Sequence, residues 1–291
     1  MPRISMIPTF LREITGTSQM PREPEPDLVM DSEDQVLAYA EAGRINGVMS
    51  AAYLFHTARI SAIISEARHV VDLGCGPATQ LAQIAQHNPK TSFLGVDLSE
   101  KMLADGKAHC SRLGLTNVQF MRADITDLNE ISDHNCDAVL STMALHHLPT
   151  IDHLAACFKE IKRILKPGGG LYLTDFSRLK YLKSILFFAY LNRKHQPHIF
   201  SLDYERSLRA AFLRSDFDTL VAQIFDSDIR TFCTFGIPIL QIVKSLDGKI
   251  SPETRERLKT MRKQLPTRYR RELDDIRFFF WQSGLRNDPF R

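Results

Sequence analysis

The stretch that most constrains the fold is residues 68–85, where a short apolar run passes through an acid into a Gly-x-Gly turn and then a helical pattern. Residues 68–73 have the composition of a buried parallel strand, and residues 79–85 carry apolar side chains at helical spacing. Gly74 and Gly76 lie on the bend, where glycine permits positive φ and a ligand can approach the unpaired N–H groups of a helix N-terminus. The pattern predicts a strand–turn–helix unit that binds a nucleotide-like ligand.

Two classes of ligand compete for this turn. A dinucleotide-binding turn prefers a third glycine three positions after the second, but Thr79 stands there. Asp72 comes just before the first glycine, and a carboxylate at that position repels a pyrophosphate and attracts a cation. Both departures favour a nucleoside that carries positive charge and no phosphate. S-adenosylmethionine, which has an ammonium and a sulfonium, is such a ligand.

The next two strands also end in acids. Residues 93–98 read as a buried strand ending at Asp97, 21 positions after Gly76. An acid at this spacing can meet the two ribose hydroxyls of a nucleoside bound on the first turn, because a carboxylate has two acceptor oxygens. Asp124 follows a third strand, where its carboxylate could accept the exocyclic amine of adenine. The acids therefore form a series along the expected strand tips.

Two more units complete the pattern. Residues 136–149 contain a strand, small polar residues and then paired histidines, and residues 151–165 predict a helix that ends before Lys166-Pro167-Gly168-Gly169-Gly170. Residues 171–176 predict a fifth strand. In order and spacing, residues 72–76, 97, 124, 137–148 and 165–176 resemble the successive motifs of class I S-adenosylmethionine-dependent methyltransferases, of the kind found in ubiquinone and menaquinone biosynthesis. The resemblance covers residues 68–177.

The resemblance implies an α/β fold: a Rossmann-like, seven-stranded, mostly parallel sheet with helices on both faces, an N-terminal helical lid and a C-terminal helical extension. It also implies positions for the parts of S-adenosylmethionine. We expect Asp72, Gly74 and Gly76 to receive the methionine part, Asp97 and Leu98 the ribose, Asp124 and Ile125 the adenine, and Ser141 to lie near the sulfonium.

The residues that meet the methyl acceptor are less determined. Methyl transfer is an in-line displacement at carbon, so alignment supplies most of the rate. A general base helps only if the acceptor holds a proton with a high pKa. His146 is the first candidate for that base. The further residues expected near the acceptor are Tyr39, Tyr53, His147 and Asp175.

The remaining chain divides by composition. Residues 1–30, which contain five prolines, predict a flexible tail, and residues 31–66 a helical lid. The methyltransferase domain is expected over residues 67–247; it includes a helix at 203–212 and a hairpin at 230–235 and 237–243. An aromatic insertion at 179–200 is either a cap over the substrate or an additional core helix. Residues 248–291 predict a C-terminal helical extension, and the terminal helices offer a candidate homodimer surface.

Composition excludes several classes of function. The net charge of +3, from 37 basic and 34 acidic residues, provides no global field for nucleic acid. The loop after the fourth strand reads Ser-Thr-Met-Ala instead of the Asn/Asp-Pro-Pro-aromatic motif with which amino-methylases hold a flipped base. We therefore expect a small, partly apolar or aromatic acceptor, methylated at O, N or C. Two alternatives stay open: RNA or protein methylation through the basic helix at 255–263, and a non-catalytic S-adenosylmethionine-binding regulator.

The cysteines and the apolar runs indicate the compartment. Five scattered cysteines form no Cys-x-x-Cys pair and no Cys/His ligand cluster, which predicts reduced thiols and no metal site. The most apolar stretch, residues 185–191, is far shorter than the roughly 20 residues of a membrane span. The N-terminus lacks the apolar run of a signal peptide. We therefore expect a cytoplasmic protein.

Overall fold

The computed structural model describes residues 4–26 and 47–291. The predicted helix that carries Tyr39 lies outside these residues, as does part of the predicted lid. The strands are β1 (His69–Leu73), β2 (Ser92–Asp97), β3 (Val118–Arg122), β4 (Cys136–Thr142), β5 (Leu165–Phe176), β6 (Arg230–Cys233) and β7 (Leu240–Lys244).

The helices of the described residues follow the same order along the chain. The α-helices are α1 (Ile7–Thr15), α3 (Ser50–Ile63), α4 (Thr79–His87), α5 (Glu100–Arg112), α6 (Ile151–Ile164), α7 (Leu182–Tyr190), α8 (His198–Ala210), α9 (Arg214–Ile224), α10 (Pro252–Gln264) and α11 (Thr267–Gln282). Two short 3-10 helices, η1 (Ile4–Met6) and η2 (Leu145–His147), complete the set.

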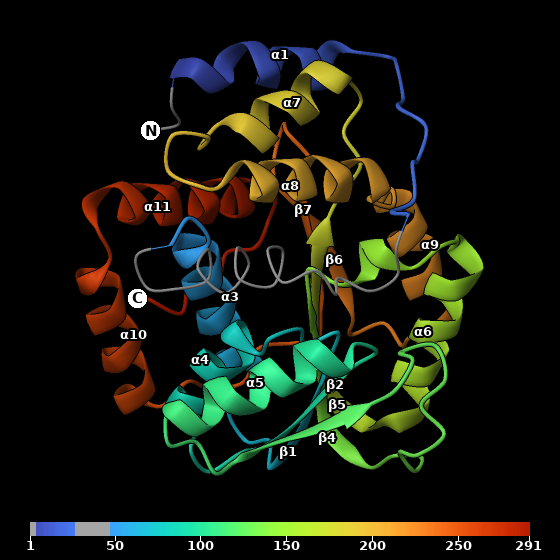
Figure 1. The fold of residues 1–291 in the computed structure, drawn as a ribbon, viewed down its shortest axis with the longest axis vertical. Helices are drawn as coiled ribbons and strands as arrows, with labels where there is room; N and C mark the ends of the chain where they lie inside the picture. Colours follow the sequence, from blue (N-terminus) through green and yellow to red (C-terminus); the bar gives the residue numbers. More distant parts are fainter. Residues whose placement is uncertain (1–3, 27–46) are drawn as a thin grey trace.

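The strands form one seven-stranded sheet in the order β3-β2-β1-β4-β5-β7-β6, at the centre of the molecule (Figure 1). Strands β3, β2, β1, β4 and β5 run parallel to one another, and β7 runs antiparallel to both β5 and β6. The predicted fold class and the predicted hairpin near the sheet edge are therefore confirmed. The strand order changes direction at β1: β2 and β3 follow on one side of it, and β4 and β5 on the other. Open α/β sheets bind their ligands at such a point, beyond the carboxyl ends of the strands.

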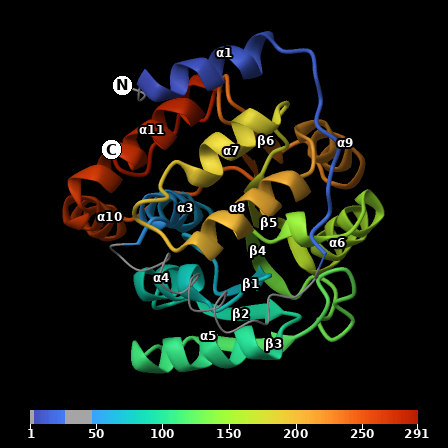
Figure 2. The ribbon, with the colours of Figure 1, turned by 45° about the horizontal axis from the view of Figure 1, so that its top comes forward.

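Helices cover both faces of the sheet because its strands are apolar on both sides. Val70 belongs to the core that includes residues of α3 and α4, and its neighbour Val71 to the core that includes residues of α6 and α9. This alternation follows from the two-residue period of a strand. Helix α1 packs against α7, and α7 packs against α8 (Figure 2).

Three elements differ from the predictions. Strand β5 begins at Leu165, six residues earlier than predicted, because Leu165 and Gly170 already pair with β4, with an irregularity between them. Helix α8 begins at His198 rather than 203. The predicted tail contains α1, whose Pro8 occupies one of the first two helical positions, where the missing N–H would have had no helical partner. Proline content therefore did not prevent a helix there.

Candidate active site

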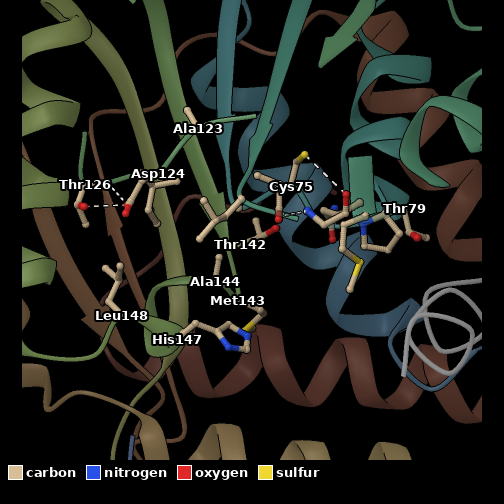
Figure 3. A pocket seen from close by; sticks show the side chains of 18 of the residues that line it. Cys75, Thr79, Ala123, Asp124, Thr126, Thr142, Met143, Ala144, His147 and Leu148 are labelled. Atoms are coloured by element: carbon tan, nitrogen blue, oxygen red, sulfur yellow. Dashed lines mark hydrogen bonds between the residues drawn. The ribbon is translucent and has the colours of Figure 1, made fainter. Parts of the chain in front are cut away.

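A cavity of about 210 Å³ lies at the carboxyl ends of β1, β2 and β4, between the turn after β1 and the loop after β4 (Figure 3). Eight residues predicted to bind the cofactor or the acceptor line it: Tyr53, Gly74, Gly76, Asp97, Leu98, Asp124, Ile125 and His147. The cavity therefore gathers the tips of successive strands, as the series of acids in the sequence predicted.

The two glycines of the turn have different physical roles. Both have positive φ, 69° at Gly74 and 52° at Gly76. A Cβ on Gly74 would lie 2.3 Å from the Cβ of Ala144, so this glycine allows the loop after β4 to pack against the turn. A Cβ on Gly76 would meet nothing within 4 Å. Because Gly76 also lines the cavity, its backbone is open to a ligand.

Asp97 ties the second strand to the first turn. Its Oδ2 accepts a hydrogen bond from the Gly76 backbone N–H at 2.8 Å, and its Oδ1 accepts one from the Ser99 N–H at 2.9 Å. Ser99 in turn caps α5 by accepting from the Met102 N–H. The carboxylate is thus held in one orientation at the cavity wall before any ligand binds, which reduces the ordering cost of binding.

Asp124 is oriented by its own turn. Its Oδ1 accepts from the backbone N–H and the hydroxyl of Thr126, at 2.8 and 2.7 Å. Figure 3 shows this pair on one side of the cavity and Cys75 and Thr79 of the β1 turn on the other. A ligand in the cavity would therefore span from the first turn to the tip of the third strand.

Asp72 lies beneath the turn and is 2% exposed. Burial, together with the charge of Asp97, raises the pKa of Asp72 to about 7, and its Oδ1 has no hydrogen-bond partner among the described residues. Burial and the charge of Asp72 also raise the pKa of Tyr53 to about 12. A buried carboxylate of this kind is stabilised by a positive charge at the cavity wall.

The structure does not bring Asp72, Ser141, His146 or Asp175 to the cavity wall. Ser141 is fully buried and donates its hydroxyl hydrogen bond to the Leu73 carbonyl at 2.9 Å. His146 is 1% exposed; its Nδ1 lies 2.7 Å from Asp175 Oδ1, and its backbone N–H donates to Asp175 Oδ2 at 2.8 Å. Burial lowers the pKa of His146, but the charge of Asp175, the hydrogen bond to it and the charge of Glu25 together outweigh burial, and the net shift is upward. His147, the next residue, does line the cavity.

Sequence reasoning missed part of the wall. The additional lining residues include Met49, Gln80, Thr142, Met143 and His153. Gln80 could not be identified, because the contact that orients its side chain joins two separate helices. Its Nε2 donates to Oγ1 of Thr57 on α3 at 2.6 Å. Met143 has a φ of 55°, a conformation that costs a non-glycine residue about 1–2 kcal/mol. Such strain is enriched at functional sites, but no sequence signal reveals it.

A second, apolar cavity of about 200 Å³ adjoins the first. The two cavities share Met49 and Met143. The second cavity is lined by side chains of α7, α8, α11 and the β6–β7 turn, among them Phe188, Phe200 and Phe279. Two of these aromatic residues, Phe188 and Phe200, come from the insertion at 179–200. Residues from both ends of the described chain therefore enclose one apolar space.

Comparison with known proteins identifies the central part of the chain. A family model described as "Methyltransferase domain" matches residues 70–169. The chain is 35% identical over 113 residues to an arsenite methyltransferase of Aquipseudomonas alcaligenes. This match covers 36% of this chain and 32% of that protein. It is 32% identical over 126 residues to a demethylmenaquinone methyltransferase of Bacillus cytotoxicus, which covers 42% of this chain and 52% of that protein. The chain thus spans between about a third and about half of these relatives.

Among solved structures, the plantazolicin methyltransferase BamL, determined in complex with a triazolic desmethylPZN analog and SAH, has the same fold. The match has a TM-score of 0.55 and 14% identity, over 74% of this chain and 91% of that chain. Among the described residues, no helix has the length and apolar character required to cross a membrane. The resemblance to class I methyltransferases, stated above from the motifs, is confirmed for residues 70–169.

Proposed function

We propose, from the methyltransferase domain that residues 70–169 form, that the whole chain is an S-adenosylmethionine-dependent methyltransferase acting on a small, partly apolar acceptor. The observation that carries the proposal is the junction of the two cavities at Met49 and Met143. One cavity lies at the strand tips where this fold binds its ligand, and the other is apolar and adjoins it. A cofactor and an acceptor bound in these cavities would meet at the two methionines.

The residues of the first cavity fit S-adenosylmethionine. The backbone of Gly76 is open, and the buried carboxylate of Asp72 favours a cationic ligand nearby. In this proposal Asp97, fixed by the Gly76 N–H, would recognise the ribose diol, and Asp124 with Ile125 would recognise adenine. When bound, the cofactor supplies a methyl group already activated by a sulfonium. The chain's own contribution is to bind, to orient and to exclude water.

The second cavity defines the class of acceptor. Its wall is mostly apolar, so an acceptor that buries aliphatic or aromatic surface there gains roughly 25 cal/mol per Å². Fixing an acceptor atom in line with the methyl group at Met143 supplies rate through orientation, worth on the order of 7–11 kcal/mol in favourable model reactions. The predicted cap over the substrate corresponds to Phe188 and Phe200 in this proposal.

The role of His146 as a base stays a prediction, because its ring belongs to neither cavity wall. The homodimer through the terminal helices also stays a prediction, for which size-exclusion chromatography with light scattering is the test. A reducing compartment such as the cytoplasm agrees with the five cysteines, all of which are free.

Transfer of a labelled methyl group tests the function directly. The purified chain would be incubated with S-adenosylmethionine labelled in its methyl group and a cell extract, and the products separated into small molecules, protein and RNA. We expect label in the apolar small-molecule fraction. Label confined to RNA or protein would favour the alternatives that use the basic helix, and binding without transfer in any fraction would favour a regulator.

A further inference from the structure

A cluster of three side chains beside the first cavity is not used by the proposed transfer. It consists of Glu25, His146 and His147, whose potential ligand atoms all lie within 4.8 Å of one another. His146 Nε2 lies 3.7 Å from Glu25 Oε1, and His147 Nδ1 lies 3.7 Å from Glu25 Oε2. The side chains are 0%, 19% and 10% exposed for His146, His147 and Glu25.

These separations are too long for hydrogen bonds, which end near 3.2 Å for N–H···O. Neither His146 Nε2 nor His147 Nδ1 has a hydrogen-bond partner among the described residues. Leaving buried polar atoms unpaired is costly. Two ligand atoms bound at about 2.0–2.2 Å to one tetrahedral ion would lie about 3.4 Å apart. The two histidine–carboxylate separations of 3.7 Å are close to this value, and all three ligand atoms lie within 4.8 Å of one another.

Hydrogen bonds from neighbouring side chains orient the members of the cluster, as is usual for metal ligands. Asp175 holds His146 by two hydrogen bonds, one at Nδ1 and one at the backbone N–H. With Nδ1–H donating to this carboxylate, the lone pair of Nε2 points toward Glu25. A carboxylate behind the distal nitrogen is the usual support of a metal-binding histidine. Ser207 donates to Glu25 Oε1 at 2.8 Å and supports the third side chain in the same way.

Separate contacts, made by Arg22, hold the N-terminal segment that carries Glu25. Arg22 donates to the carbonyls of Ala210, Pro149, His146 and Leu148, and its guanidinium stacks on the Phe212 ring. The N-terminal segment is thereby fastened across the loop after β4. Glu25 makes none of these Arg22 contacts. Its position next to the two histidines is therefore a separate feature of the interface between the N-terminal segment and this loop.

We propose that Glu25, His146 and His147 bind one divalent transition-metal ion, with Zn²⁺ as the best match to a two-histidine, one-carboxylate set. The ion links the N-terminal segment to the loop after β4 and so fixes a wall of the first cavity, since His147 lines it. This replaces the expectation of no metal. It also removes His146 as a base, because a metal-bound imidazole nitrogen has no lone pair left to accept a proton.

Metal binding by the full chain, without cofactor or acceptor, is the test. The protein would be stripped with a chelator, titrated with Zn²⁺ by calorimetry, and examined with Co²⁺ for visible absorption bands. We expect one equivalent per chain, a loss of more than about 100-fold in affinity for Glu25→Gln or His147→Gln, and a loss of about 10–100-fold for Asp175→Asn. The matched controls are Glu23→Gln, an exposed carboxylate two residues away, and His195→Gln, an exposed histidine; both should bind as the wild type does.

Folding defects are separated by a second measurement. Zn²⁺ should raise the melting temperature of the wild type and of both controls, but not that of His147→Gln, whose partly exposed side chain makes it the mildest variant. The proposal is overturned if the folded wild type takes up no metal, or if the cluster variants bind as tightly as the controls. In that case the three side chains form a purely ionic contact. Because no methyl transfer is measured, this result is independent of the proposed function.

Discussion

The two cavities that meet at Met49 and Met143 are built in different ways. Apart from Met49 and Tyr53, the wall of the first comes from residues 74–153, at the ends of successive strands. The wall of the second draws on residues from Met6 to Phe279. The first cavity is therefore walled mainly by turns, whose geometry is local. The second is walled mainly by helices, whose positions depend on packing between distant parts of the chain.

The largest expected effect of a single change is at the first turn. In Gly74→Ala, positive φ costs about 1–2 kcal/mol and the 2.3 Å approach to Ala144 adds about 1–3 kcal/mol of overpacking. Chemical denaturation should show the summed loss, and calorimetry should show much weaker binding of S-adenosylhomocysteine. Gly114→Ala is the matched control, with a φ of 67°, nothing within 4 Å and a position away from the cavity. Equal losses in the two variants would mean that strain alone, and not the approach to Ala144, makes Gly74 necessary.

Asp97→Asn should weaken S-adenosylhomocysteine binding by about 2–3 kcal/mol, or roughly 30–150-fold. The reason is that the charge-assisted bonds of this carboxylate, to the Gly76 N–H and to a ligand diol, are lost together. Calorimetry measures the change. Glu100→Gln removes a nearby exposed carboxylate that pairs with Arg122 and should leave the affinity within about twofold. An unchanged affinity in Asp97→Asn would remove the ribose assignment.

The pH dependence of stability should report Asp72. The pKa of Asp72 is raised to about 7 in the folded protein, above its pKa in the unfolded chain. At pH values between these two pKa values, the folded state holds a proton on Asp72 that the unfolded state has lost. Stability is then present at low pH and lost as pH rises, by roughly 2 kcal/mol between about pH 5.5 and pH 8. Urea denaturation of the ligand-free protein should show this decline, and Asp72→Asn should lack it. A variant with the same slope as the wild type would assign the dependence to other groups.

The second cavity should be separable from the first. Ala52 lies on α3 at the wall of the apolar cavity only, and Ala52→Phe places a ring in it. We expect methyl transfer to the identified acceptor to fall at least about tenfold, with S-adenosylhomocysteine affinity within about twofold. Ala104→Phe, on the exposed side of α5, is the control for a bulky substitution. Loss of cofactor binding in Ala52→Phe would show that the two cavities act as one site.

The smallest effect is expected on α10. Arg257 is an exposed residue that pairs with Glu253 at 3.6 Å, a kind of contact worth about 0–1 kcal/mol. Arg257→Glu should therefore leave stability within about 0.5 kcal/mol and methyl transfer to a small acceptor unchanged. Thermal denaturation and the transfer assay check both. A large drop in transfer would revive a nucleic-acid or protein substrate docked on the basic helix.

The sequence by itself determined the sheet, the turn and most of the strand-tip residues. Gly76, Asp97 and Asp124 could be found because a parallel strand, its turn and its acid are adjacent in the chain, and the repeated units place their tips side by side. Even at these strand tips, tertiary packing decided which side chains face the cavity. Ser141 follows the predicted strand, but the sheet buries its hydroxyl against Leu73, and the neighbouring Thr142 lines the cavity instead.

Only the tertiary structure decided which residues enclose the second cavity. No local pattern links Met49 to Phe279, or Glu25 to the paired histidines, because these contacts arise when helices and the N-terminal segment pack over the finished sheet. Side-chain periodicity reports which face of an element is buried, and it carries no information about the partner that buries it. The turn after β1 could therefore be read from the chain, whereas the second cavity and the cluster of Glu25, His146 and His147 required the fold.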